Sequence, residues 1–271
     1  MPAELEKRIA TAGRILLEQS AYFTQHFGKV ESHWKADSSR VTEADLTLSR
    51  NILSSLRALY PDDDSVSEEE LPSIEEGPRT LRKRFCWVLD PIDGTNNYAL
   101  GLPLCGILLA LLEDGLPAYG WTYDPLGKRL VEGGPGHGLR VNGVRVPAPP
   151  QPASLDRHAF VTLHFPQSAE NLRRLAPLLS HSTGRCLGSA ALHFVYNVLG
   201  VVDGSFCHSG KVWDIAAGHA QLAAVGRRMI FLETDPFPLH ALLPKPPNLP
   251  NLAGTEAFLR FTLPLFEKTA H

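Results

Sequence analysis

The sequence predicts a mixed α/β (α+β) protein whose two halves are built differently. Two amphipathic helix patterns stand near the N-terminus, and apolar segments separated by turn dipeptides follow between residues 84 and 146. After a proline-rich stretch, strand-like and helix-like segments alternate. We therefore expect helices and an antiparallel sheet in the N-terminal half, and a mixed or parallel sheet with helices in the C-terminal half.

Two early stretches carry apolar residues at helical spacing, which is typical of helices with one buried face. The first set is Ile9, Ala12, Leu16, Phe23 and Phe27, and the second is Leu48, Ile52, Leu56 and Leu59. They predict one helix over residues 4–27 and another that begins near Thr42 and stops at Pro61, because proline ends a helix.

The strand-like segments of the first half are "RFCWVLD", "LCGILLALLEDG", "AYGWTYDP" and "GLRVNGVRV". Asp-Gly, Pro-Leu-Gly and Asn-Gly turn signals lie within or between them, which is the pattern of an antiparallel meander. Residues 146–156 are rich in proline and poor in apolar bulk, so we expect a linker between an N-terminal half, 1–147, and a C-terminal half, 155–271.

In the second half, "HAFVTLHF" and "RMIFLE" resemble strands, whereas "SAENLRRLAPLLS", "GSAALHFVYNVLG" and "DIAAGHAQLAAVG" resemble helices. This alternation predicts a second α/β layer. The stretch 235–250 is rich in proline and weakly patterned.

Composition excludes several classes of function. The chain has 271 residues with a formal net charge of −3, and its Lys and Arg residues are scattered, so a nucleic-acid polymer is not an expected partner. The charged N-terminal residues do not resemble a signal peptide, and no apolar run reaches the roughly 20 residues that span a bilayer. The four cysteines are widely separated, which favours reduced thiols. We expect a soluble cytoplasmic protein with no membrane role.

The segment "CWVLDPIDGTNNY" ends an apolar run in two acids, Asp90 and Asp93. Two neighbouring carboxylates repel each other unless a cation lies between them, and Mg²⁺ prefers such oxygen ligands. The carbonyl of Ile92 is a further possible ligand, and Gly94 lets the backbone turn without a side chain. The alternative is a solvated turn, because Asp, Pro, Gly and Asn are common turn residues.

Three further acidic features have ordinary structural explanations when each is taken alone. The run Glu68, Glu69 and Glu70 fits a solvated surface. Asp214, in "KVWDIAAG", fits a helix N-cap, and Asp45, in "VTEAD", fits a capping box. Together with the paired aspartates, they make a shared metal site the stronger interpretation.

These segments resemble the motifs of the inositol monophosphatase family, whose members are Mg²⁺-dependent, lithium-sensitive phosphatases. "WVLDPIDGTNNY" is similar to the first motif of the family, and "WDIAAG" is similar to the second. "VTEAD" and "SEEE" resemble its upstream threonine-aspartate and acidic segments. The resemblance implies a layered αβαβα fold of the sugar-phosphatase type, a homodimer, and direct attack by water on a small phosphorylated metabolite.

Carried over residue by residue, the resemblance implies two or three Mg²⁺ ions and a set of roles. Implied metal ligands are Glu69, Asp90, the Ile92 carbonyl, Asp93 and Asp214. Implied catalytic residues are Thr95, which would orient the water, Asp45, which would hold Thr95, and Glu69. Glu68 and Trp213 would contact the metal ligands without binding metal themselves, and the backbone N–H groups of Gly94 and Thr95 would bind phosphate.

The implied substrate residues are Gly188, Ser189, Ala190 and Cys207. Inositol-specific members carry a glutamate seven residues before the second-motif aspartate, and Cys207 replaces it here. Inositol phosphate is therefore a weak candidate, and a histidinol phosphatase or a 3′,5′-bisphosphate nucleotidase stays open. A non-catalytic, metal-binding family member is the remaining alternative. In the upstream segment, Lys35 matches bacterial members, whereas Arg40 replaces their proline.

Overall fold

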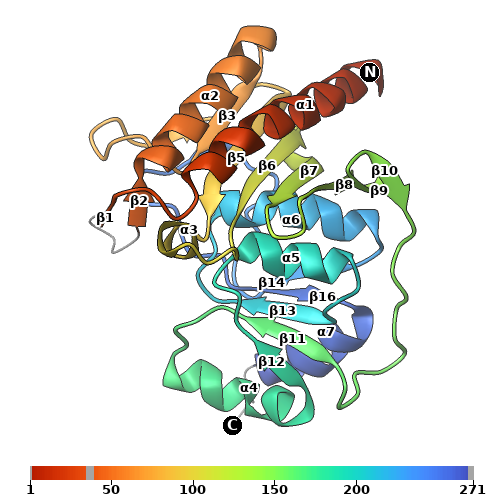
Figure 1. The fold of residues 1–271 in the computed structure, drawn as a ribbon. Coiled ribbons are helices and arrows are strands. Elements are labelled where there is room, and N and C mark those ends of the chain that lie inside the picture. Colours follow the sequence, from red (N-terminus) through yellow and green to blue (C-terminus); the bar gives the residue numbers. More distant parts are fainter. Residues whose placement is uncertain (1, 35–39, 268–271) are drawn as a thin grey trace.

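Helices and sheets alternate in five layers (Figure 1). The structure is a computed structural model and describes residues 2–34 and 40–267. Its helices are α1 (Pro2–His26), α2 (Glu43–Leu59), α3 (Thr95–Leu100), α4 (Ala169–His181), α5 (Ala190–Val198), α6 (Val212–Ala224) and α7 (Glu256–Thr262), followed by a 3₁₀ turn, Leu263–Leu265. The layers run from α1 and α2, through a large sheet, α5 and α6, and a smaller sheet, to α4 and α7. The predicted αβαβα fold is thereby confirmed.

The large sheet has seven strands in the order β10-β9-β8-β7-β6-β5-β3. Its strands are β3 (Asp64–Ser67), β5 (Phe85–Asp93), β6 (Gly106–Glu113), β7 (Leu116–Asp124), β8 (Arg129–Gly134), β9 (Gly138–Val141) and β10 (Val144–Val146). All neighbours pair antiparallel except β3 and β5, which are parallel. The antiparallel meander predicted from the turn signals is present.

Side chains along β5 point alternately to the two faces of this sheet, and both faces are covered by helices. Trp87 and Leu89 pack with α1 and α2, whereas Cys86 and Val88 pack with α5 and α6. Successive side chains of a strand point to opposite faces, so a strand buried on both faces is a continuous apolar run. Strand β5, which lies next to the edge strand β3, places its last residues at the end of the sheet nearest the N-termini of α5 and α6.

The smaller sheet has five strands in the order β12-β11-β13-β16-β14. Its strands are β11 (Phe160–Leu163), β12 (Thr183–Arg185), β13 (Gly204–Cys207), β14 (Arg228–Phe231) and β16 (Asn251–Gly254). The pairs of β11 with β12 and with β13 are parallel, and β16 pairs antiparallel with β13 and β14. The mixed sheet expected for the C-terminal half is present.

Two central strands of this sheet, β13 and β16, have no strong signal in the sequence. Both are four residues long and contain glycine, which is depleted in strands. Tertiary contact explains Gly204, because a Cβ there would lie 2.1 Å from the ring of Phe258. The weakly patterned stretch 235–250 contributes the two-residue strand β15 (Ala241–Leu242), which pairs with β4 (Arg79–Thr80).

The remaining short elements lie close to the end of β5. Strands β1 (Ser32–Trp34) and β2 (Arg40–Thr42) form an antiparallel pair that leads into α2.

Residues 147–159 form no helix or strand, as the proline-rich composition predicts, and the division into two domains there stays a prediction. Within the described ranges, no helix combines the length and apolarity that crossing a bilayer requires.

Candidate active site

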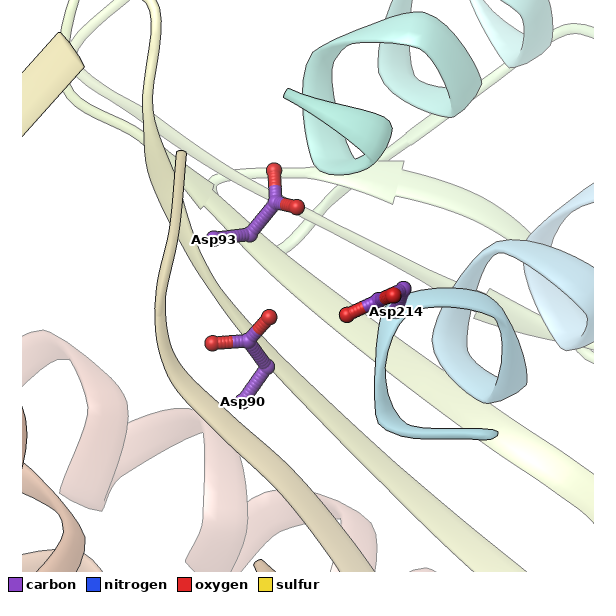
Figure 2. A group of neighbouring side chains, drawn as sticks. All are labelled: Asp90, Asp93 and Asp214. Carbon is purple, nitrogen blue, oxygen red and sulfur yellow. The ribbon is translucent and has the colours of Figure 1, made fainter. Parts of the chain in front are cut away.

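Three aspartates meet where β5 approaches the start of α6. Asp90, Asp93 and Asp214 each offer a carboxylate oxygen, and these oxygens all lie within 4.8 Å of one another. Figure 2 shows Asp90 and Asp93 on neighbouring parts of one chain segment and Asp214 facing them from the helix. Asp90 and Asp93 are 2% and 7% exposed. The solvated-turn interpretation of this motif is therefore wrong.

A β-bulge brings the first two aspartates together. Residues three apart in a regular strand point to opposite faces of the sheet. The pairing of β5 with β6 shifts between Asp90 and Asp93 and then resumes, with Asp93 opposite Gly106. The strand thus continues beyond Asp90, where the sequence predicts its end, and the irregularity turns both carboxylates to one side. Pro91 lies within this shift, where the loss of a ladder hydrogen bond is tolerated.

Burial raises the pKa of all three carboxyl groups, and repulsion by neighbouring charges adds to the shift for Asp90 and Asp214. Burial is the largest cause for each, and for Asp90 the charges of Glu68, Asp93 and Asp214 add to it. The pKa of Asp214 is raised to about 8 by burial and by the charge of Asp93, although the Lys211 backbone N–H opposes the shift. A site that resists three negative charges without a cation is suited to bind one.

Asp93 is held by the first turn of α5. Its Oδ1 accepts from the backbone N–H of Ala190 at 3.1 Å, and its Oδ2 accepts from Ala191 N–H at 2.9 Å and from the Ser189 hydroxyl. These bonds lower the Asp93 pKa, but burial outweighs them. Two donors occupy Oδ2 and one occupies Oδ1, so Oδ1 retains more capacity for a cation.

Asp214 occupies the third position of α6. The N-cap is Lys211, whose backbone N–H donates to Oδ2 of Asp214 at 2.6 Å. The N-cap position considered for Asp214 is thus wrong by three residues, although the carboxylate still accepts a backbone bond at the helix start. Helix N-termini favour negative charge, so the starts of α5 and α6 partly offset the repulsion within the cluster.

Asp45 combines the two functions that the sequence leaves open. Its Oδ2 accepts from the backbone N–H of Thr42 at 2.8 Å and from the Thr42 hydroxyl at 2.6 Å, which completes the capping box of α2. Its Oδ1 lies 3.3 Å from Oγ1 of Thr95. Oγ1 of Thr95 also lies 2.9 Å from the Ile92 carbonyl oxygen. The single hydroxyl proton can serve one of these acceptors at a time.

Gly94 allows the chain to turn directly after Asp93. Its φ of +79° lies in the left-handed region that glycine favours, and it forms the N-cap of α3. A Cβ at this position would lie 2.9 Å from the carbonyl oxygen of Leu104. Glycine is therefore required both by the backbone conformation and by the close approach of the next loop.

The glutamate run follows β3, the parallel neighbour of β5. Glu68 donates its backbone N–H to Leu89 O at 3.3 Å, and its charge raises the pKa of both Asp90 and Asp214. Glu70 instead forms a salt bridge with Arg57 on α2. These electrostatics favour Glu68 as the acid nearest the cluster, so the order of Glu68 and Glu69 in the metal shell stays a prediction.

The remaining predicted residues line the side of the cluster nearest the smaller sheet. Gly188, Ser189 and Ala190 lead into α5 beside Asp93. Cys207 is 4% exposed, and burial raises its pKa to about 12, with Asp214 and Asp93 adding to the shift. Trp213, on α6, is buried in the hydrophobic cluster that joins the large sheet to α5 and α6. Lys35 lies outside the described residues.

Two residues beside the cluster have no role in the sequence-based prediction. Asn97, inside the first motif, donates to the carbonyls of Leu104 at 2.6 Å and Leu187 at 2.8 Å. His193 accepts from the backbone N–H of Leu187 at 3.2 Å. The position of Asn97 four residues after Asp93 could have drawn attention to it, whereas His193 stands in an ordinary apolar helix and gives no such signal.

Comparison with known proteins agrees with this geometry. The sequence model of the inositol monophosphatase family matches residues 3–248 of the chain. The chain belongs to the inositol monophosphatase family. Membership confirms the resemblance inferred from the motifs and places the chain among phosphoric monoester hydrolases.

Two relatives show how differently members of the inositol monophosphatase family are named. A probable inositol 1-monophosphatase ImpA of Mycobacterium tuberculosis is 36% identical over 211 residues, which cover 72% of this chain and 73% of that protein. A Nus factor SuhB of Vibrio cholerae is 30% identical over 196 residues, which cover 70% of this chain and 71% of that protein.

A solved structure of the inositol monophosphatase family has the same fold. It is a dual specific IMPase/NADP phosphatase bound with D-inositol-1-phosphate. It superimposes with a TM-score of 0.79 at 21% identity, covering 100% of this chain and 98% of that one. At this identity the likeness establishes the fold.

Proposed function

We propose that this chain is a Mg²⁺-dependent phosphomonoesterase that hydrolyses a small phosphorylated polyol, sugar or related metabolite. The observation that carries the proposal is the cluster of the buried Asp90 and Asp93 with the half-buried Asp214, whose carboxylate oxygens lie within 4.8 Å of one another. Carboxylates packed this closely are the ligands that Mg²⁺ prefers. Their raised pKa values show that burial disfavours the charged carboxylates, and a bound cation would offset that cost.

The residues present fit Mg²⁺, and we infer two or three ions from the family resemblance. Asp90, Asp93 and Asp214 would hold them together with the Ile92 carbonyl and an acid of the Glu68–Glu69 pair. Bound Mg²⁺ supplies Lewis-acid polarisation of phosphate oxygens, a lowered pKa for bound water and stabilisation of the leaving oxygen.

Thr95 would orient the attacking water. When its hydroxyl donates to Asp45, the Ile92 carbonyl is free for a cation, and a lone pair of Oγ1 is free to accept a hydrogen bond from water. The Thr42 bonds hold Asp45 in place, so Oδ1 of Asp45 stays available as an acceptor for the Thr95 hydroxyl. Water attacks phosphorus directly in this scheme, and no Ser or Cys nucleophile is required.

We infer that the substrate is not selected by a buried carboxylate at position 207. Cys207 is an uncharged, buried thiol, which is a weak donor and a poor acceptor. Inositol 1-phosphate is thus not expected to be strongly preferred, and histidinol phosphate or a 3′,5′-bisphosphate nucleotide fits as well. The solved relative that acts on both inositol phosphate and NADP supports a permissive site.

A non-catalytic regulatory role is the second candidate. The relatives named Nus factor SuhB favour it, because the family name does not by itself imply the same cellular function. The intact cluster argues against it, because every predicted carboxylate position is filled. We also infer from the family resemblance that the protein acts in the cytoplasm as a homodimer. Light scattering on the purified protein would test the dimer.

The decisive experiment measures phosphate release from a generic phosphomonoester with Mg²⁺ and with excess chelator. Asp214→Asn removes a charge from the cluster, whereas Asp62→Asn makes the same change at an exposed position and serves as the control. We expect activity only with Mg²⁺, its loss in Asp214→Asn and its retention in Asp62→Asn. Full activity in chelator, or an active Asp214→Asn enzyme, would refute the proposed function.

A further inference from the structure

A short turn next to the aspartate cluster is held by side chains instead of by regular backbone pairing. It comprises Cys186–Ser189, between β12 and α5. His193 Nε2 accepts the backbone N–H of Leu187 at 3.2 Å, and Asn97 Nδ2 donates to the Leu187 carbonyl at 2.8 Å. Both backbone groups of one turn residue are thus satisfied by side chains from two different helices, α3 and α5.

The histidine of this pair is in the form that can accept. His193 is 2% exposed, and burial lowers its pKa to about 3, with the charge of His164 adding to the shift. It is therefore neutral, and because a backbone N–H can only donate, Nε2 must be the unprotonated nitrogen. The Leu187 N–H would lose this partner if the imidazole were replaced by an apolar side chain, which is costly at a partly buried position.

The asparagine holds the turn from the opposite side and leaves little space. Asn97 Nδ2 also lies 3.4 Å from the Gly188 carbonyl and 2.6 Å from the Leu104 carbonyl. Gly188 has a φ of +67°, and a Cβ there would lie 2.9 Å from Asn97 Nδ2. The turn thus fits between the two side chains only with glycine at position 188.

The position of this turn determines the donors that hold Asp93. Ser189 is the last residue of the turn, and its hydroxyl donates to Oδ2 of Asp93. The N–H groups of Ala190 and Ala191 donate to the same carboxylate. If the turn shifts, these donors shift with it, and the carboxylate that faces Asp90 and Asp214 loses its fixed orientation.

We propose that Asn97 and His193 are positioning residues that set the affinity of the site for Mg²⁺ through the Cys186–Ser189 turn and Asp93. Neither residue is a metal ligand or a substrate contact in this scheme. The inference rests on the proposed function, because it assumes that Asp93 binds the cation. Ordering of a ligand by its hydrogen-bond partners commonly changes metal affinity by about 10- to 100-fold.

Isothermal titration calorimetry with Mg²⁺ alone tests the proposal without relying on turnover. His193→Leu removes the acceptor, whereas His193→Gln places an amide oxygen close to the former Nε2. His219→Leu is the matched control, because His219 is a largely buried histidine that packs on Phe231 and Phe237, away from the turn. Asn97→Ser is a second variant, in case His193→Leu does not fold.

We expect His193→Leu and Asn97→Ser to weaken Mg²⁺ binding about tenfold or more. We expect His193→Gln to stay within about threefold of the wild type, and His219→Leu to leave binding unchanged. With saturating Mg²⁺, the kcat of His193→Leu should recover while its Mg²⁺ requirement stays high.

Two results would overturn the proposal in different ways. If His193→Leu or Asn97→Ser is less stable but binds Mg²⁺ like the wild type, the turn has only a structural role. If His193→Gln is as impaired as His193→Leu, the acceptor is not what matters. A wild-type protein that shows no Mg²⁺ binding would refute the proposed function itself, which the same titration reveals separately.

Discussion

Thr95 and Asp45 are 50 residues apart in the chain, yet Oγ1 of Thr95 lies 3.3 Å from Oδ1 of Asp45. The two oxygens of Asp45 face different partners, because Oδ2 accepts from Thr42 at the start of α2 and Oδ1 faces the hydroxyl of Thr95. One side chain therefore links the start of a helix to the residue that we propose orients water.

Substitution of Thr95 tests that role. We expect Thr95→Val to lower kcat about 100-fold or more, because the variant keeps the shape and loses the hydroxyl that orients water. Thr95→Ser keeps the hydroxyl and should stay within about tenfold of the wild type. Melting temperatures of both variants should remain near that of the wild type, and a Thr95→Val enzyme with normal kcat would exclude a role for this hydroxyl.

The raised carboxyl pKa values predict how stability depends on pH without metal. A carboxyl whose pKa is higher in the folded protein than in the unfolded chain stabilises the fold at low pH, and this contribution is lost as pH rises through the folded value. For Asp214 the window runs from its ordinary value of 3.8 to about 8. The chelated protein should therefore become less stable between about pH 4 and pH 8, as denaturant unfolding would show.

Mg²⁺ should reverse that loss of stability. At about 100 times its dissociation constant a ligand adds about 2.7 kcal/mol, which corresponds to a rise in Tm of roughly 5 °C for a chain of this size. The rise should be larger at pH 8 than at pH 5, because protons compete with the cation for Asp90, Asp93 and Asp214. Equal shifts at both pH values would contradict the assignment of the carboxylates as ligands.

The glutamate run provides a test of register. We expect Glu68→Gln to reduce activity at least tenfold, because the charge of Glu68 acts on Asp90 and Asp214. Glu70→Gln should be nearly silent in activity and cost no more than about 1 kcal/mol, because its partner Arg57 is at the surface. If Glu69→Gln instead reduces activity more than Glu68→Gln does, Glu69 is the metal ligand, as the family resemblance implies.

Substrate preference should be broad or directed away from inositol phosphate. We expect no tenfold advantage in kcat/KM for either enantiomer of inositol 1-phosphate over every competitor, because Cys207 offers no charged partner for a ring hydroxyl. The panel should include fructose 1,6-bisphosphate, histidinol phosphate, adenosine 3′,5′-bisphosphate and glycerol 2-phosphate. A clear preference for inositol 1-phosphate, by about 1.4 kcal/mol or more, would mean that other residues contact the hydroxyls.

The sequence by itself determined the long amphipathic helices, the meander and the acidic motifs. Residues close in the chain produce these signals, so periodicity and turn dipeptides suffice to predict them. Asp90 and Asp93 could be paired in the same way, because they lie three residues apart in one motif. The fold class follows from the order of such local patterns.

Only the tertiary structure decided what lies opposite each motif. Strands β13 and β16 form because neighbouring strands and Phe258 surround them, and their own residues have weak strand preference. The bulge in β5 turns Asp93 toward Asp90, and the start of α6 brings Asp214 to both from more than one hundred residues away. The partnership of Asn97 and His193 on Leu187 likewise depends on packing between α3 and α5, because hydrogen bonds between distant segments leave no periodic trace in the sequence.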